Sequence, residues 1–141
     1  LHLDLTIESN GPSPPDLRSL IGNHLYGFDD CQLCCPWNRF GTIGDPVFSV
    51  RHRLDAAPLA DLFTWTADEF DARLAGSPIR RIGYERWLRN IAVALGNATY
   101  SPEIVAALSS RRGDPSPLVR EHVLWALSRF SMKKNSDKST Q

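Results

Sequence analysis

Residues 79–96 read Ile-Arg-Arg-Ile-Gly-Tyr-Glu-Arg-Trp-Leu-Arg-Asn-Ile-Ala-Val-Ala-Leu-Gly, and this stretch decides the fold class of the chain. Its large apolar residues recur at positions i, i+3, i+4, i+7 and i+11, which places them on one face of an α-helix. Gly96, followed by Asn97, is typical of a helix end. The stretch therefore predicts an amphipathic helix with a single apolar stripe. The stripe consists of Tyr84, Trp87, Leu88, Ile91 and Leu95.

Further helices are predicted on both sides of this stretch. Thr66 and Glu69 form a capping box that starts a helix ending near Gly76. Two Ser-Pro pairs, each an N-cap residue with proline in the first turn, start helices over residues 101–110 and 116–130. Antiparallel helices joined by short turns predict a helical-repeat array.

The N-terminal part of the chain follows other patterns. Residues 1–8 alternate apolar and polar side chains, which predicts a short strand. Two prolines then start a short helix over residues 16–21, and Gly22 ends it. Residues 41–58 show little periodicity, so we expect a connector there and a domain boundary near residue 55.

All three cysteines lie in one short run, at Cys31, Cys34 and Cys35, and Pro36 follows the last of them. A Cys-Pro pair that closes a cysteine run is typical of iron–sulfur loops, although a cubane takes about four thiolates. Zinc is an alternative, with His24 as a nitrogen ligand. Reduced thiols in a packed loop are another. An odd, low number of cysteines argues against a disulfide framework.

Residues 73–89 hold five arginines and one acidic residue, in a chain whose 16 basic and 16 acidic residues cancel. Arginine forks bind phosphate in pairs of hydrogen bonds, and a neighbouring amide can contact a sugar or base edge. The pattern predicts an RNA-binding face away from the apolar stripe. Its candidate residues are Arg80, Arg81, Arg86, Arg89 and Asn90. Alternatively, these arginines form an ordinary solvated face, or they pair with acids of the preceding helix. Those acids are Asp61, Asp68 and Asp71.

Composition places the chain among ordinary globular proteins. It has 141 residues, of which 42% are hydrophobic and 23% are charged, so it can bury one core or two small ones. No apolar run has membrane length and no signal peptide is visible, so a cytoplasmic protein is expected. The four histidines show no ligand spacing, and His122 is expected to be a partly exposed surface residue.

Three separate stretches resemble the epoxyqueuosine reductases. Ile21–Asn38 is similar to the second cluster motif of that family, Leu5–Glu8 to its Leu-Thr-Ile-Glu sequence, and residues 81–90 to its arginine-rich helix. The similarity runs from residue 1 to about residue 130. It identifies the chain as the C-terminal part of such a protein, and it implies that the cobalamin-binding domain, the catalytic acid and the first cysteine run lie before residue 1.

The resemblance implies a mainly α fold in this part. Residues 1–55 would be the end of a ferredoxin-like iron–sulfur module with a short strand, a helix and the cysteine loop. Residues 56–130 would be HEAT-like antiparallel repeats, and the polar residues 131–141 are expected to be a disordered tail.

The resemblance also implies cofactors and a partner. The family uses cobalamin and two [4Fe–4S] clusters to reduce epoxyqueuosine to queuosine in tRNA. Cys31 and Cys35 match ligand positions of its motif, Cys34 is an additional thiol, and Leu1 and Phe28 stand where the family has cysteines.

Three functions follow from these patterns and from the resemblance. The first is part of a tRNA-modifying reductase, with a [4Fe–4S] relay in the cysteine loop and a monomeric helical part that binds the anticodon arm. The alternative is a non-catalytic helical RNA- or protein-binding module with a decayed cluster loop. A zinc-stabilised loop with a purely structural role is a third possibility.

Overall fold

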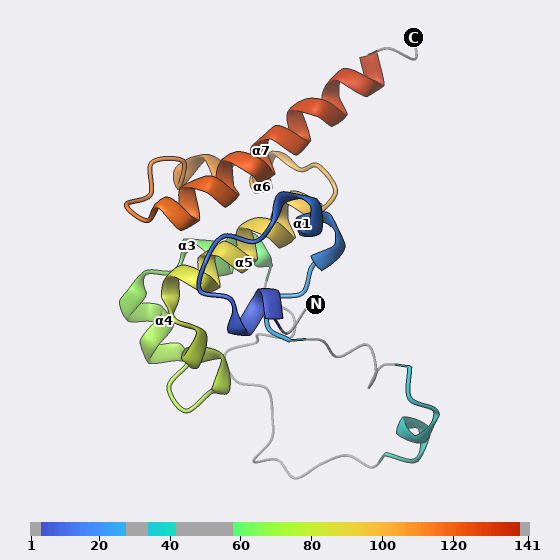
Figure 1. The fold of residues 1–141 in the computed structure, drawn as a ribbon, viewed down its shortest axis with the longest axis vertical. Coiled ribbons are helices and arrows are strands. Elements are labelled where there is room, and N and C mark those ends of the chain that lie inside the picture. The colour runs from blue at the N-terminus through green and yellow to red at the C-terminus, as the bar shows by residue number, and fades with distance from the viewer. Residues whose placement is uncertain (1–3, 28–33, 42–57, 139–141) are drawn as a thin grey trace.

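The computed structural model describes residues 4–27, 34–41 and 58–138. All regular structure in these ranges is helical, so the chain has the mainly α fold that the sequence predicts (Figure 1). The α-helices are α1 (Pro15–Ile21), α3 (Leu59–Thr64), α4 (Ala67–Arg73), α5 (Tyr84–Asn97), α6 (Pro102–Ser110) and α7 (Pro117–Lys138). Short 3₁₀ turns add Pro36–Phe40 and Pro78–Ile82.

Helix α5 is the centre of the fold. It packs most extensively against α7 and also contacts α1, α3, α4 and α6. In Figure 1, α7 crosses above α5 and α4 lies below it. Every residue of α5 from Trp87 to Gly96 is buried. A helix that is buried on all sides needs a covering element on each side, and the N-terminal segment supplies the one that the helices leave open.

The main hydrophobic core lies between α5, α3, α4 and α7. The indole of Trp87 is its largest buried side chain, and it packs against Trp65 and Phe70 with ring centroids 6.1 and 5.9 Å apart. Ile7 joins this core, while Leu5 belongs to a smaller cluster with Ile21 and Val93. The N-terminal segment therefore shares its packing with α5.

Several local predictions are confirmed. Helix α4 begins with the capping box, because Thr66 Oγ1 accepts from the Glu69 amide at 3.2 Å and Glu69 Oε2 accepts from the Thr66 amide at 2.9 Å. Helix α1 ends before Gly22, whose φ of 64° favours glycine. Prolines open α6 and α7 as the Ser-Pro pairs predict.

The short strand predicted over residues 1–8 is wrong in its described part. Asp4–Glu8 is a single π-helical turn, closed by a 2.7 Å hydrogen bond from the Ser9 amide to the Asp4 carbonyl. A strand would bury alternate residues, but three successive residues of this turn are buried. Side chains of α5 donate hydrogen bonds to the carbonyls of Leu5, Thr6 and Ile7, and this tertiary contact replaces a strand partner.

Both ends of the helical region also differ from the sequence pattern. The helix predicted from residue 79 starts at Tyr84, because Gly83 has a φ of 79° and separates it from the preceding 3₁₀ turn. Helix α7 continues to Lys138, so the tail predicted to be disordered from residue 131 begins as helix. No glycine or proline occurs after Pro117 to stop it, and its C-terminal part projects beyond the other helices (Figure 1).

The predicted domain boundary near residue 55 lies outside the described residues. The assignments of residues 1–55 to a ferredoxin-like module and of residues 56–130 to HEAT-like repeats stay predictions. No helix in the described ranges is both long enough and apolar enough to cross a membrane.

Helix α5 ends at Asn97, as the sequence predicts, and Gly96 has a packing role in addition. It lies inside α5, and a Cβ atom at this position would stand 2.7 Å from the Trp125 ring, 2.9 Å from Ala126 Cβ and 3.0 Å from Ala126 Cα. The missing side chain is therefore what lets α5 and α7 approach each other closely.

We expect Gly96→Ala to lower the free energy of unfolding by about 1 kcal/mol. Forcing a methyl group into a packed contact costs about 1–3 kcal/mol, which outweighs the gain of about 1 kcal/mol in helix propensity. Urea unfolding measures this difference. Gly113→Ala is the matched control, because a Cβ there meets no atom within 4 Å; an equal effect at both glycines would contradict the close approach.

Candidate functional site

The cysteine loop is described only at its C-terminal end. Cys34 is exposed, Cys35 is partly buried, and both are free thiols. Pro36 opens the 3₁₀ turn that follows, and the Cys35 carbonyl accepts from the Asn38 amide at 3.1 Å. Cys31, the other predicted ligand, lies outside the described residues.

The thiols that the structure describes do not form a metal site by themselves. Two thiols are half of the about four that a cubane takes, and no group of three or more His, Cys, Asp or Glu side chains in the described ranges could hold a metal ion. His24, the nitrogen ligand of the zinc alternative, has its Nδ1 atom 2.9 Å from the Ile21 carbonyl oxygen. Both metal hypotheses therefore stay predictions that depend on Cys31.

The predicted arginine face separates into exposed and buried members. Arg80 and Arg81 are exposed at the 3₁₀ turn before α5. Arg80 Nε lies 2.9 Å from Asp71 Oδ1, one of the acids that the alternative interpretation named, and Arg81 lies 3.8 Å from Glu8. Surface pairs of this kind contribute little and exchange readily with other anions, so both guanidinium groups remain available to a phosphate.

Arg89 and Asn90 are buried, which corrects their assignment to an RNA-binding face. Arg89 is 0% exposed and Asn90 is 3% exposed. The guanidinium of Arg89 donates to the carbonyls of Leu5 at 2.6 Å, Ser9 at 2.8 Å and Gly11 at 2.8 Å. Neither side chain can meet a ligand in solution without unfolding this contact.

Arg86 and Asn97 act in the same way as Arg89 and Asn90. Arg86 donates to the Ile82 carbonyl and, at 3.0 Å, to the Ile7 carbonyl. Asn97 donates to the carbonyls of Arg18 and Gly22 at 2.8 and 2.9 Å. We call these four α5 side chains, Arg86, Arg89, Asn90 and Asn97, the carbonyl clamp.

The carbonyl clamp also fixes the chain where it enters the cysteine loop. Asn90 Nδ2 donates to the Thr6 carbonyl at 2.8 Å and to the Leu25 carbonyl at 2.7 Å. The Gly27 amide donates to Thr6 Oγ1 at 3.0 Å. The last described residues before Cys31 are thus tied to the centre of α5, which gives the loop a defined starting point.

Burial removes the Arg89 guanidinium from water, so its charged form depends on hydrogen-bond acceptors within the protein. Desolvation, with the nearby Arg86 charge, lowers the pKa of Arg89 to about 10. The group is still charged at neutral pH, and backbone carbonyl oxygens supply its described hydrogen-bond acceptors together with the Asn90 side-chain oxygen at 3.0 Å.

Helix α7 holds the same N-terminal segment from its other side. The Ser13 amide donates to His122 Nε2 at 3.1 Å, and His122 Nδ1 lies 2.8 Å from the Leu118 carbonyl. Burial lowers the pKa of His122 to about 4, so the ring is neutral and accepts through Nε2. Arg18, also buried, pairs with Glu121. The expectation of a partly exposed His122 is therefore wrong.

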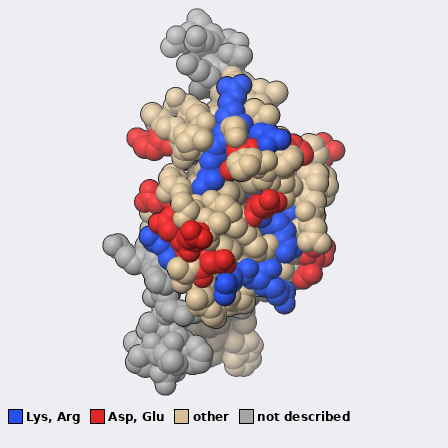
Figure 2. Space-filling view, turned by 90° about the vertical axis from the view of Figure 1, so that its left-hand side faces the viewer, with Lys and Arg blue, Asp and Glu red and all other residues tan. Residues whose placement is uncertain are grey.

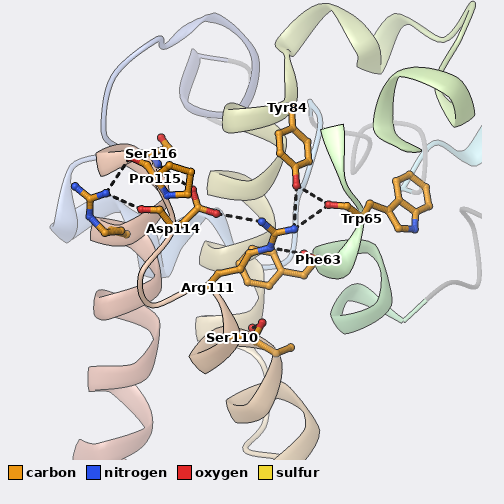
Figure 3. A network of polar contacts seen from close by, with 10 residues as sticks. Phe63, Trp65, Tyr84, Ser110, Arg111, Asp114, Pro115 and Ser116 are labelled. Carbon is orange, nitrogen blue, oxygen red and sulfur yellow. Dashed lines mark hydrogen bonds and ion pairs between the residues drawn. The ribbon is translucent and has the colours of Figure 1, made fainter. Parts of the chain in front are cut away.

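Arg111 joins α3 and α5 to the turn before α7. Arg111 donates to the carbonyls of Phe63 and Trp65 at 2.7 and 2.8 Å and pairs with Asp114 at 3.1 Å (Figure 3). It also bonds the Tyr84 hydroxyl at 2.9 Å. This network fixes α3, α5 and the turn before α7, so Arg111 is a structural residue.

The surface shows no large field of one sign on the face in Figure 2, where basic and acidic side chains are interspersed. This agrees with the zero net charge of the chain. On this face, nucleic acid would therefore have to be recognised through a few specific cations rather than through a broad basic surface.

Known proteins resemble this chain over nearly all of it. Epoxyqueuosine reductase of Pseudomonas aeruginosa is 59% identical over 126 residues, which are 89% of this chain and 35% of that protein. The Escherichia coli epoxyqueuosine reductase is 50% identical over 133 residues, which are 94% and 35% of the two chains. This chain is a homologue of the epoxyqueuosine reductases. It spans about a third of the length of these relatives.

The fold supports the same relationship. A crystal structure of a selenomethionine-labelled epoxyqueuosine reductase superposes with a TM-score of 0.75 and 26% identity, over 91% of this chain and 34% of that one. No protein-family profile matches the chain. Likeness to the epoxyqueuosine reductases therefore rests on sequence identity and on the arrangement of the helices.

The sequence contained a signal for the carbonyl clamp that periodicity alone did not reveal. Ala92, Val93 and Ala94 are apolar on faces of α5 outside the predicted stripe, which indicates burial on every side. An arginine among such residues is more consistent with a buried donor than with an RNA ligand. The relation of α5 to residues 5–11 carries no sequence signal of its own.

We expect Arg89→Met to lower the free energy of unfolding by about 3 kcal/mol or more. The substitution keeps the apolar stem but leaves at least three carbonyls without their donor, and each unsatisfied group costs about 1–3 kcal/mol. Urea unfolding followed by circular dichroism measures the loss. Arg81→Met is the matched control; because its side chain is 72% exposed, a change within about 0.5 kcal/mol is expected. Equal stabilities of the two variants would contradict the carbonyl clamp.

Proposed function

We propose that this chain supplies the cysteine loop and the tRNA-binding helical part of a reductase that converts epoxyqueuosine to queuosine in tRNA. The observation that carries this proposal is the 50–59% identity to proteins named epoxyqueuosine reductase. The chain corresponds in this proposal to their C-terminal third. Cobalamin and the carbon–oxygen chemistry then belong to the part of the reductase that this chain does not span.

The cysteine loop has the proposed task of holding part of a [4Fe–4S] electron relay, with Cys31 and Cys35 as ligands and Cys34 as a further thiol. The carbonyl clamp supports this task, because it ties Leu25 and Thr6 to α5 and so fixes the start of the loop relative to the helices. A defined loop position matters for a relay, since hydrogen bonds and solvent exposure around the thiolates set its potential.

The helical part has the proposed task of seating the tRNA anticodon arm as a monomer. Arg80 and Arg81 are the two residues of the predicted arginine face that stay exposed. They lie at the turn that precedes α5, so a phosphate bound there would stand next to the helix that carries the clamp. Arg86, Arg89 and Asn90 support this surface from beneath.

A chimera tests the reductase function directly. We expect that replacing the matching third of the Escherichia coli relative with this chain restores queuosine to the tRNA of a strain that lacks its reductase. Cys31→Ala or Cys35→Ala should abolish queuosine and lower the iron content of the purified chimera. Cys34→Ala is the matched thiol variant, and its iron content shows whether Cys34 is a ligand. An abundant, folded chimera without queuosine would overturn the proposal; unchanged iron in the Cys31 and Cys35 variants would favour the decayed-loop alternative.

The tRNA surface has its own test. We expect the Arg80→Ala, Arg81→Ala double variant to bind tRNA more weakly and to reduce the slope of log K against log salt by about 1.5, because each phosphate contact contributes about 0.7–0.9. Filter binding over a salt series measures the slope. Arg120→Ala removes the same charge from a side chain that donates to the Asp114 and Pro115 carbonyls, and it should leave the slope unchanged. A double variant with the wild-type slope would remove both arginines from the interface.

A further inference from the structure

Arg112 differs from every other arginine that the structure describes. It is exposed at the turn between α6 and α7, and no hydrogen bond, ion pair or ring contact of its side chain is found in the described part of the chain. The other described arginines pair with acids, donate to carbonyls or lie over aromatic rings. Arg112 therefore presents a guanidinium whose donors all remain available to an anion.

A groove of about 470 Å³ lies beside Arg112, between α6 and α7. Leu124, Leu127 and Val105 are apolar residues of its lining, and three serines line it as well. The serines are Ser109, Ser128 and Ser131. Among the described residues that line the groove there is no carboxylate. The groove is therefore open to negative charge, and its volume falls within the range of small-ligand sites.

Tyr100 gives the groove an aromatic wall. Tyr100 is 54% exposed as a residue, and its ring stands edge-on to the ring of Phe130, with centroids 5.9 Å apart and an interplanar angle of 76°. Phe130 is 4% exposed and packs in the core. A fixed buried ring thus orients an exposed one, so that Tyr100 offers a π-face at low conformational cost.

We propose that this groove binds an unpaired nucleotide of an RNA, with the base stacked on Tyr100 and the adjoining phosphate bound by Arg112. Proteins read single-stranded RNA by stacking splayed bases on aromatic rings beside cations that follow the backbone. The hydroxyls of Ser128 and Ser131 donate to the carbonyls of Trp125 and Leu127, so their oxygens can accept from the sugar or the base edge, while Ser109 can donate or accept. The free cation, the exposed ring and the lack of acidic lining favour a nucleotide over a protein segment, which would not need an unpaired guanidinium.

This inference deepens the proposed tRNA binding and rests on it for the identity of the RNA. Arg80 and Arg81 contact phosphates at the N-terminal end of α5 in that proposal, whereas the groove of Arg112 lies between α6 and α7. The first surface would hold a paired stem through its backbone, and the groove would hold a base that has left the stack.

Fluorescence anisotropy with the full chain tests the groove. The probes are a labelled anticodon-arm hairpin with its seven-nucleotide loop and a fully paired duplex of the same length. We expect Tyr100→Ala and Arg112→Glu each to weaken binding of the hairpin by about tenfold and to leave duplex binding within about twofold, since stacking of one base and one charged phosphate contact each contribute on that scale. Tyr100→Phe and Arg112→Lys keep the ring and the charge, and they should bind the hairpin nearly as the wild type does.

Each other outcome has a definite meaning. Wild-type hairpin binding by both disruptive variants overturns the groove and leaves the Arg80 and Arg81 surface untouched. Concentration-dependent self-association that Tyr100→Ala abolishes overturns it in favour of a second copy of the chain. Groove-dependent binding together with a chimera that makes no queuosine keeps the groove and overturns the reductase proposal. A wild-type chain that binds neither probe overturns both RNA surfaces, while the chimera still decides the reductase function.

Discussion

The hydrogen bonds from Arg89 to the carbonyls of Leu5, Ser9 and Gly11 are the interaction on which the rest of this structure depends. Residues 5–11 form no strand pairing, so their carbonyls need donors from elsewhere. Arg89 needs acceptors equally, because a buried cation without partners is very unfavourable. Each side satisfies the other, and this mutual requirement explains how a turn of irregular backbone covers a helix that would otherwise expose its second face.

The same contact changes where function can reside. Arg89 and Asn90 donate to backbone carbonyls and not to RNA. Both lie in the stretch that resembles the arginine-rich helix of the epoxyqueuosine reductases. Their role reaches the cysteine loop, because Asn90 also bonds the Leu25 carbonyl shortly before Cys31. Helix α5 thus connects the loop proposed for electron transfer with the surface proposed for tRNA. A substitution of Arg89 would therefore disturb both.

Few of the described arginines on this molecule are available to bind an anion. The net charge is zero, and most described arginines are engaged by acids, carbonyls or rings. RNA contact in such a protein depends on the few cations without a strong partner, and a single free guanidinium beside an exposed aromatic ring then carries more information than a count of arginines. The groove that Arg112 and Tyr100 both line is such a place, whereas the arginine-rich stretch is largely used for folding.

The sequence by itself determined the helices, the capping box at Thr66 and Glu69, the Ser-Pro helix starts and the likeness to the epoxyqueuosine reductases, because caps, periodicity and motifs are local properties of the chain. Only the tertiary structure decided that Asp4–Glu8 is a helical turn, that Gly96 permits close packing with α7, and that Arg89 and His122 are buried. Each of these depends on contacts between residues about 30 to 110 positions apart. Helical periodicity describes one stripe of α5, and it cannot show that a distant segment covers the opposite face.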